Sequence, residues 1–287
     1  LVLPLASALV LTVLVFGLHM SWGYLVEGRA KRQLAQVFGT YVPPELVTEM
    51  LRSPERYGMA ATTREMTVMF CDMKGFTAIA ETMEPQQLQA LLNEVFSRLS
   101  AVVSRHRGTI DKYMGDCLMA FWGAPLETPG HARLAVEAAL AIVAEVEALN
   151  REHRRRGLPE IGLGVGLSTG PMCVGDMGSD IRRSYTVIGD AVNLGARLEG
   201  LSRVYGVDIV ASERTRELAP GFAWQQIDLV RVKGKAQAVA IHTPLGHDAD
   251  GGPVPEDELA EWDGFLRAWR ARDWDACEAL LAHLLRR

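Results

Sequence analysis

The chain has 287 residues, of which 48% are hydrophobic and 23% charged, which is enough for one globular domain with flanking segments. Its formal net charge is −5, so it lacks the basic field that attracts DNA or RNA, although a small nucleotide remains a possible ligand. None of the four cysteines lies in a CxxC pair, which indicates a reducing compartment. The seven histidines are scattered and do not have the spacing of a zinc site.

The N-terminal segment is strongly apolar, and its first 26 residues contain no Asp, Glu, Lys or Arg. Since about 20 apolar residues suffice to cross a bilayer as a helix, we expect a transmembrane helix over residues 1–26. The basic residues Arg29, Lys31 and Arg32 follow directly, and the positive-inside rule therefore places the rest of the chain in the cytoplasm, at the inner (plasma) membrane. A signal peptide and a buried core helix remain alternatives, but the former would carry its basic residues ahead of the apolar stretch.

Two connecting segments flank the main domain. Residues 27–60 have the pattern of a juxtamembrane helical connector that is interrupted at Pro43 and Pro44, because proline lacks an amide hydrogen and clashes with the preceding turn. Residues 246–287 begin as a linker rich in Gly, Pro and acids and continue as two amphipathic helices that meet near Asp273. We expect this C-terminal helical hairpin to be a packing appendage.

Residues 61–245 form the main domain, in which strand and helix patterns alternate. A β-prone run over 66–71 is followed by a helix that begins at Pro85 and repeats apolar residues with the 3.6-residue period. Two short β-prone runs around Gly115 and Asp116 predict a hairpin.

A second helix is predicted to start near Thr128 and to end at Gly157. Residues 161–170 then predict a strand, and residues 171–179 predict its hairpin partner. The order of strand, helix, hairpin, helix and strand indicates an α+β fold, with a mostly antiparallel sheet and helices on one face.

Two acids occupy unusual places in this pattern. Asp72 ends the first strand and Asp116 lies at the hairpin tip. Burying a carboxylate is costly unless it is paired or binds a cation, and the first strand of such a unit lies beside the hairpin, so Asp72 and Asp116 should approach each other. Two carboxylates without a basic partner nearby in sequence suit a hard cation such as Mg²⁺. Because neighbouring strand residues face opposite ways, Cys71 should face the core and Asp72 should face outward. That both are ordinary strand-end and turn acids stays open.

A further stretch, residues 184–200, reads as a short strand, a turn at Gly189 and a helix for which Asp190 is a plausible N-cap. Asn193 and Arg197 are four residues apart and share one helix face, where an amide and a guanidinium can donate hydrogen bonds to a developing negative charge. The alternative is a solvated face with Arg197 paired to a local acid.

Four stretches, taken together, carry a family resemblance: FCDMKGFTAIAE, DKYMGDCLMAFWGAP, YTVIGDAVNLGARLE and VRVKGKAQAVAIH. In this order and spacing they resemble the catalytic domain of class III adenylate and guanylate cyclases, specifically of membrane-anchored bacterial adenylate cyclases. The resemblance implies a ferredoxin-like βαββαβ core. It also implies a phosphorus–oxygen lyase that converts ATP to cyclic AMP and pyrophosphate in membrane-linked signal transduction.

The resemblance also assigns roles to residues of the site. Asp72, the Met73 carbonyl and Asp116 would hold two Mg²⁺ or Mn²⁺ ions. Asn193 and Arg197 would stabilise the transition state. The substrate's phosphates would be bound by Lys233 and by the turn after Asp72, which contains Gly75, Phe76 and Thr77.

Base selection falls, by the same resemblance, to Lys112 and Thr186. The second of these positions is often Asp in mammalian adenylate cyclases, and guanylate cyclases usually carry Glu and Cys at the pair. A lysine donor suits the unprotonated N1 of adenine, whereas a threonine can donate or accept and so discriminates less. We therefore expect ATP as substrate, with some turnover of GTP left open.

In this family the metal-bearing face of one catalytic domain meets the Lys, Thr, Asn and Arg face of another. The resemblance thus implies a head-to-tail homodimer with two equivalent sites. It also implies that residues 27–51 act as a transducer and that an upstream sensor domain is a candidate partner. The alternatives are a guanylate cyclase, a diguanylate cyclase, whose GGDEF signature is missing, and a catalytically inert cyclase-like interaction module.

Overall fold

The computed structural model describes residues 9–19, 61–179, 181, 183–232, 238–247 and 256–286. The chain divides into two units, Leu1–Gly58 and Met59–Arg287. In the first unit, residues 9–19 are helical, and no helix within the described ranges has the length and apolar character needed to cross a membrane. The transmembrane helix expected over residues 1–26 is therefore not supported. The connector expected over residues 27–60 lies outside the described residues.

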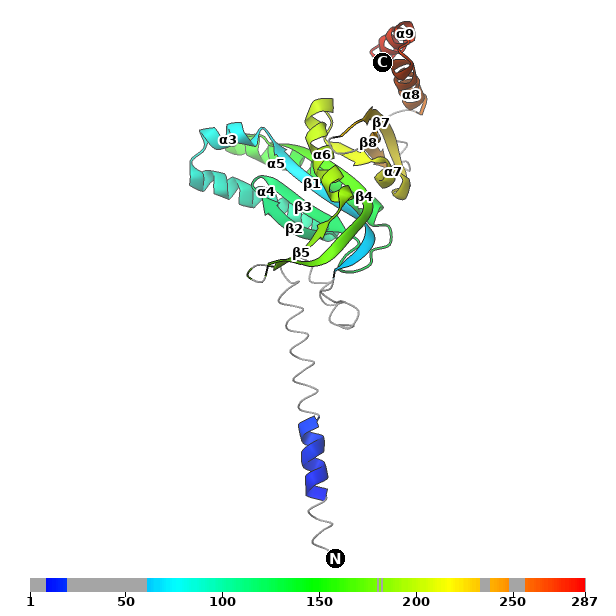
Figure 1. The fold of residues 1–287 in the computed structure, drawn as a ribbon. Helices are drawn as coiled ribbons and strands as arrows, with labels where there is room; N and C mark the ends of the chain where they lie inside the picture. Colours follow the sequence, from blue (N-terminus) through cyan, green and yellow to red (C-terminus); the bar gives the residue numbers. More distant parts are fainter. Residues whose placement is uncertain are drawn as a thin grey trace, which may run out of the picture. The chain divides into compact units, whose positions relative to one another are not determined.

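The second unit contains all the labelled elements of Figure 1. In chain order these are β1 Thr62–Lys74, α3 Phe76–Thr82, α4 Pro85–Arg105, β2 Thr109–Met114, β3 Cys117–Trp122, α5 His131–Arg156, β4 Gly162–Gly178, β5 Arg183–Ile188, α6 Asp190–Tyr205, β6 Ile209–Ser212, α7 Glu213–Leu218, β7 Phe222–Val230, β8 Val239–His247, α8 Glu256–Ala271 and α9 Trp274–Leu284.

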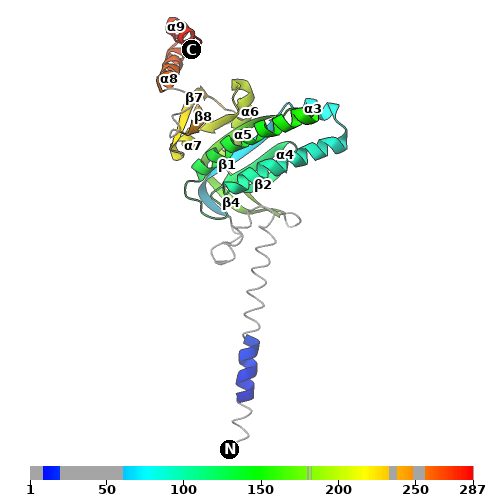
Figure 2. The ribbon, with the colours of Figure 1, turned by 180° about the vertical axis from the view of Figure 1, so that it is seen from behind.

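The strands form one sheet in the order β2-β3-β1-β4-β6-β8-β7, with β5 paired to β4. Strand β1 pairs antiparallel with β3 and β4, and β2 pairs antiparallel with β3, so the expected α+β fold with a βαββαβ core is confirmed. The pairing of β4 with β6 is parallel, which makes the sheet mixed. Helices α4 and α5 lie side by side on one face, and α6 lies on the other (Figures 1 and 2).

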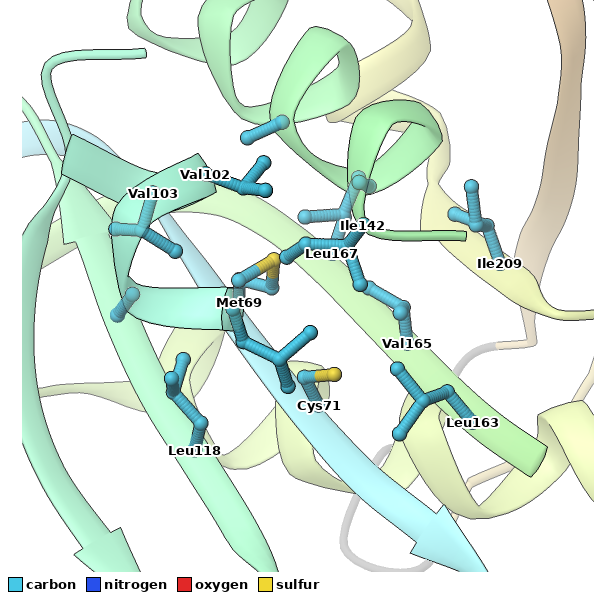
Figure 3. Packing of buried hydrophobic residues seen from close by; sticks show 14 of the residues in the cluster. Met69, Cys71, Val102, Val103, Leu118, Ile142, Leu163, Val165, Leu167 and Ile209 are labelled. Atoms are coloured by element: carbon cyan, nitrogen blue, oxygen red, sulfur yellow. The ribbon is translucent and has the colours of Figure 1, made fainter. Parts of the chain in front are cut away.

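The alternation of β1 separates the core from the site. Met69, Cys71 and Met73 are buried on the face covered by α4 and α5, in the main hydrophobic cluster, part of which Figure 3 shows. Residues between them in sequence face the other way, because successive strand side chains alternate. Cys71 thus faces the core, and Asp72 is directed to the face that carries α6.

Helix α6 packs unusually close to β4. The strand carries glycine at every second position over 162–166, which leaves a groove without side chains on the α6 face. A Cβ atom at Gly166 would lie 2.3 Å from the Gly195 carbonyl oxygen and 2.3 Å from the Glu199 amide nitrogen. Only glycine fits this backbone contact, which therefore determines where α6 presents its side chains.

The expected hairpin over residues 161–179 is wrong, because β4 is one continuous strand and its hairpin partner is β5. Pro171 lies opposite Glu65 of β1 within the pairing. The other edge of β4 pairs with β6 at 165–167 and with β5 only from Cys173 onward. Pro171 thus lies between these pairings, where one edge of the strand needs no amide donor.

Several helix ends match the sequence signals, and two do not: α5 begins at His131 with Gly130 at the N-cap and not near Thr128, and the start of α6 also differs. Helix α4 begins at Pro85, α5 ends at Gly157 with φ 68°, and Asp273 accepts a hydrogen bond from the Ala276 amide at 3.1 Å to cap α9. Asp190, however, is the first helical residue of α6 and Gly189 occupies the N-cap position. Its carboxylate can still favour the positive end of the helix dipole.

We predict that Gly166→Ala destabilises the protein by about 1–3 kcal/mol or more, because the added methyl group overlaps backbone atoms that cannot move aside. Urea unfolding of the purified protein measures the change. Gly200→Ala is the control, since Gly200 is exposed on α6 with no atom within 4 Å of the new Cβ. This control should gain roughly 0.5–1 kcal/mol from the lost flexibility of glycine. Equal stability of the two variants would contradict the close approach of α6 to β4.

Candidate active site

The structure brings Asp72 and Asp116 together at one edge of the sheet. Cys71 of β1 pairs with Leu118 of β3, so the end of β1 lies beside the β2–β3 turn. Burial raises the pKa of Asp72. The charge of Asp116 and a hydrogen bond with the Asp116 side chain raise the pKa of Asp72 further. The two carboxyl groups therefore lie close enough to repel each other when both are ionised.

A basic side chain that the sequence pattern did not indicate lies against this pair. The Nη2 atom of Arg203 donates to Asp72 Oδ2 at 2.8 Å and to the Met73 carbonyl at 3.2 Å. The guanidinium lowers the pKa of Asp72, against the effect of burial. It contacts two of the groups assigned to a metal ion, which indicates that this corner of the protein attracts a cation.

The donor set fits a hard divalent ion. Carboxylates and a backbone carbonyl are oxygen ligands, and the Met73 side chain is buried on the other side of the sheet, which leaves only its carbonyl for this role. Within the described ranges there is no group of three His, Cys, Asp or Glu side chains that could hold a metal ion. A pair of carboxylates is nevertheless typical of Mg²⁺ sites, in which substrate phosphates and water complete the shell.

Glu199 adds a third acid to this corner. It lies one turn before Arg203 on α6, and its Oε1 atom is buried without a hydrogen-bond partner in the described part of the chain. Burial and then the charge of Asp72 raise the pKa of Glu199 to about 7. The sequence analysis assigned no role to Glu199 or Arg203, although their four-residue spacing could have indicated that they share a helix face.

The turn that follows Asp72 has the form expected of a phosphate-binding turn only in its backbone. Gly75 adopts φ 75°, a left-handed conformation that favours glycine, and its carbonyl accepts from the Ala78 amide at 3.1 Å. The Phe76 side chain packs partly against the main core, so it is not free to contact a ligand. Thr77 is exposed.

A second cluster joins β2 and β5. Lys112 Nζ donates to Thr186 Oγ1 at 3.2 Å, so the two residues assigned to base selection lie side by side although 74 positions separate them. Thr186 in turn donates to Asp111 Oδ2 at 2.6 Å, and Lys112 Nζ lies 3.3 Å from Asp111 Oδ1. Burial raises the pKa of Asp111, while the bond from Thr186 and the charge of Lys112 lower it. The sequence analysis missed Asp111, whose only signal was its place beside Lys112.

The remaining assigned residues lie on α6 or outside the described chain. Asn193 is exposed and Arg197 is partly exposed, one turn apart, while Leu194 and Leu198 are buried and anchor the helix. The alternative reading paired Arg197 with a local acid. Among the residues that the structure describes, no acid pairs with Arg197. Lys233 lies outside the described residues.

We predict that, without divalent metal, Glu199→Gln weakens the pH dependence of stability. A glutamate has a pKa near 4.3 when unfolded and about 7 here, so the native state binds more protons in between. The free energy of unfolding therefore falls as the pH rises through this window. Thermal unfolding in a chelator at about pH 5 and about pH 8 measures the difference in Tm between the two conditions.

Glu199→Gln should be more stable than wild type at the higher pH. Asp72, whose pKa is also raised, keeps part of the dependence. Glu147→Gln, at an exposed position of α5, is the control and should behave as wild type. A pH dependence of Glu199→Gln equal to that of wild type would show that the buried acid is not the cause.

Comparisons with known proteins agree with this geometry. Residues 59–243 match the family described as "Adenylate and Guanylate cyclase catalytic domain". The chain is 37% identical over 210 residues to Adenylate cyclase 1 of Rhizobium meliloti (strain 1021), which covers 73% of this chain and 32% of that protein. It is 36% identical over 191 residues to Adenylate cyclase of Anabaena cylindrica, covering 64% and 37% of the two chains. The chain thus spans about a third of the length of these relatives.

Solved structures give the same picture. The adenylyl cyclase CyaB from P. aeruginosa is 32% identical with a TM-score of 0.61, covering 64% of this chain and 95% of that one. The guanylyl cyclase Cya2 is 30% identical with a TM-score of 0.59, covering 65% and 94%. The βαββαβ core, the paired acids and the matched residues lead to one conclusion: the chain belongs to the family of adenylate and guanylate cyclase catalytic domains.

Proposed function

We propose that the protein is an adenylate cyclase, which converts ATP to 3′,5′-cyclic AMP and pyrophosphate. The observation that carries this choice of base is the contact of Lys112 Nζ with Thr186 Oγ1 at 3.2 Å, in a chain of the cyclase family. A lysine offers hydrogen bonds to the N1 acceptor of adenine and only repels the N1–H of guanine. The relatives from Rhizobium meliloti and Anabaena cylindrica, both named adenylate cyclases, support it. Guanylate cyclase is the second candidate, because Cya2 is similar at 30% identity.

The side chains fit in-line attack of the ribose 3′-hydroxyl on the α-phosphorus. Asp72, the Met73 carbonyl and Asp116 would hold two Mg²⁺ or Mn²⁺ ions, which when bound supply Lewis-acid stabilisation of the phosphate oxygens and acidify the hydroxyl. Asn193 and Arg197 donate hydrogen bonds to the charge that builds on the phosphoryl group.

Phosphate binding involves two further parts of the chain. Lys233 binds the terminal phosphates, and the exposed backbone after Asp72, at Gly75, Phe76 and Thr77, accommodates their oxygens. These roles rest on the match to the family's motifs.

We infer that the active form is a head-to-tail homodimer. The acids at the end of β1 and in the β2–β3 turn lie on other elements than the donors Asn193 and Arg197 on α6, and in the family each site takes its metal ligands from one domain and its donors from the other. A closed two-fold arrangement then makes two equivalent sites. The rival, an inert cyclase-like module, would typically have lost one of these residues, whereas Asp72, Asp116, Asn193 and Arg197 are all present.

From the sequence we further propose that residues 1–26 anchor the protein in the inner membrane, with residues 61–245 in the cytoplasm and residues 27–60 as transducer of an upstream sensor. The apolar composition and the basic residues Arg29, Lys31 and Arg32 support this proposal. Sedimentation of expressed full-length protein with the membrane fraction, and its release only by detergent, would test it.

We predict that the purified protein forms cyclic AMP from ATP with Mn²⁺ in excess over cyclic GMP from GTP. Asp72→Ala should abolish the activity. Asn193→Ala should lower it by about 10²–10³-fold through loss of a transition-state donor. Mixed together, the two variants should regain about a quarter of wild-type activity, since half of randomly assorted dimers are heterodimers with one intact site.

The control is a mixture of Asp72→Ala with Asp116→Ala. Both defects then fall on the same half of each site, so no heterodimer contains an intact site. Recovery in this control, or none in the test mixture, would contradict shared sites. Absence of any cyclic product from dimeric wild-type protein would favour the inert module.

We predict that Mn²⁺ raises the Tm of the protein without nucleotide, because an ion that binds only the native state adds about 2.7 kcal/mol of stability at a hundred times its Kd. Asp72→Asn should remove this effect, since it takes away a charged ligand and the repulsion between Asp72 and Asp116 that the ion relieves. Differential scanning calorimetry with and without Mn²⁺ measures it. An unchanged Mn²⁺ effect in Asp72→Asn would place the ion elsewhere.

A further inference from the structure

The direction of one hydrogen bond determines what Thr186 can offer to a base. Thr186 has a single hydroxyl proton, and its Oγ1 lies 2.6 Å from Asp111 Oδ2. An ionised carboxylate only accepts, so Thr186 is the donor in this contact. Lys112 Nζ, at 3.2 Å, donates to the same oxygen. The threonine therefore has no proton left for a ligand and presents a lone pair.

The surroundings of Asp111 hold this direction in place. The Asp111 side chain is 1% exposed, so water cannot compete for its oxygens. The groups that face it are donors: the Thr186 hydroxyl bonds to Oδ2, the Lys112 ammonium lies 3.3 Å from Oδ1, and the backbone of Val187 also lowers the pKa of Asp111. Within the described residues, Oδ1 itself completes no hydrogen bond. Burial raises the pKa of Asp111, whereas these donors favour its ionised form, which is the form that can only accept.

We propose that Asp111 is a positioning residue that sets the base preference, by taking the proton of Thr186 so that the threonine acts only as an acceptor. The inference rests on the proposed cyclase activity and extends it. Adenine presents a donor, its 6-amino group, beside an acceptor, N1. Guanine presents the reverse pattern, the O6 acceptor beside the N1–H donor. Lys112 and Thr186 together then form a donor and an acceptor that match adenine and oppose guanine at both atoms.

The proposal departs from the expectation that threonine discriminates less. A hydroxyl that is free to rotate would accept from adenine or donate to guanine with equal ease. A hydroxyl held by a buried carboxylate loses the second option, and a site with a polar group left unpaired rejects the wrong ligand strongly.

The direct test is Asp111→Asn, which keeps the size of the side chain but adds an amide that can donate to Thr186. The hydroxyl proton of Thr186 then becomes available to the O6 of guanine. We expect the ratio of kcat/KM for ATP to kcat/KM for GTP to fall about tenfold or more, mainly through the two KM values, because a net hydrogen bond is worth about that factor. A wild-type ratio in a folded, active Asp111→Asn protein would overturn the proposal.

Two controls separate positioning from a general structural effect. Asp228→Asn removes a carboxylate that accepts from the Tyr205 hydroxyl at 2.6 Å, the same kind of contact elsewhere in the domain, and should leave the ratio unchanged. Thr186→Val removes the hydroxyl, so in that background Asp111→Asn should change the ratio little further. An equally large change in the valine background would show that Asp111 acts without Thr186, against the proposal.

A measurement on the wild-type protein covers the case in which Asp111→Asn does not fold. Inosine triphosphate carries the O6 and N1–H of guanine but lacks its 2-amino group. If Thr186 is only an acceptor, the protein should reject inosine triphosphate about as strongly as GTP. Turnover of inosine triphosphate as efficient as that of ATP would overturn the proposal.

Failure of this inference is distinguishable from failure of the proposed function. If wild type makes cyclic AMP while Asp111→Asn keeps its base ratio, only the inference fails. If wild type makes no cyclic nucleotide, the Kd values of fluorescent ATP and GTP analogues replace the kinetic ratio. A preference for the ATP analogue that Asp111→Asn loses would then support the inference, and equal affinities in wild type would contradict it.

Discussion

The close contact between α6 and β4 is the constraint on which the rest of the site depends. Glycines on β4 leave no side chain between strand and helix, so the backbone of α6 at Gly195 and Glu199 rests directly on Gly166. Because the helix lies this close, its side chains reach the end of β1, where Arg203 meets Asp72. The same seating orients Asn193 and Arg197 on the outer side of the helix. A side chain of even one methyl group at position 166 would push α6 away from β4 and so displace both sets of residues.

Charge is distributed unevenly around that contact. Burial and mutual repulsion raise the pKa of Asp72, and the same two causes raise that of Glu199 to about 7, while the charges of Arg203 and Lys74 lower the pKa of Glu199. A divalent ion at this corner would relieve the repulsion between the acids, which is the physical reason for proposing one here. The cluster of Asp111, Lys112 and Thr186 on β2 and β5 differs, because there a single buried acid faces hydrogen-bond donors. There, the Thr186 hydroxyl donates to Oδ2 of the buried Asp111 and the Lys112 ammonium lies 3.3 Å from Oδ1, which has no hydrogen-bond partner within the described residues.

Local patterns in the sequence predicted most of the fold and part of the site. The 3.6-residue periods, Pro85, Gly157 and the Gly115–Asp116 turn correctly indicated α4, α5 and the β2–β3 hairpin. The expected hairpin within residues 161–179 was wrong because the sequence does not say which segments pair with each edge of β4. The motif match named Asp72, Asp116, Lys112 and Thr186, and the structure brings the members of each pair into contact.

The sequence by itself determined which elements form and which residue types are available, since helix periods, strand alternation and turn residues act within a few positions. Only the tertiary structure decided which polar groups face each other. Arg203 reaches Asp72 across 131 positions, and Thr186 reaches Asp111 across 75. The energies of these contacts depend on burial and on the direction of each hydrogen bond. Burial and hydrogen-bond direction are both set only when the sheet brings distant strands together.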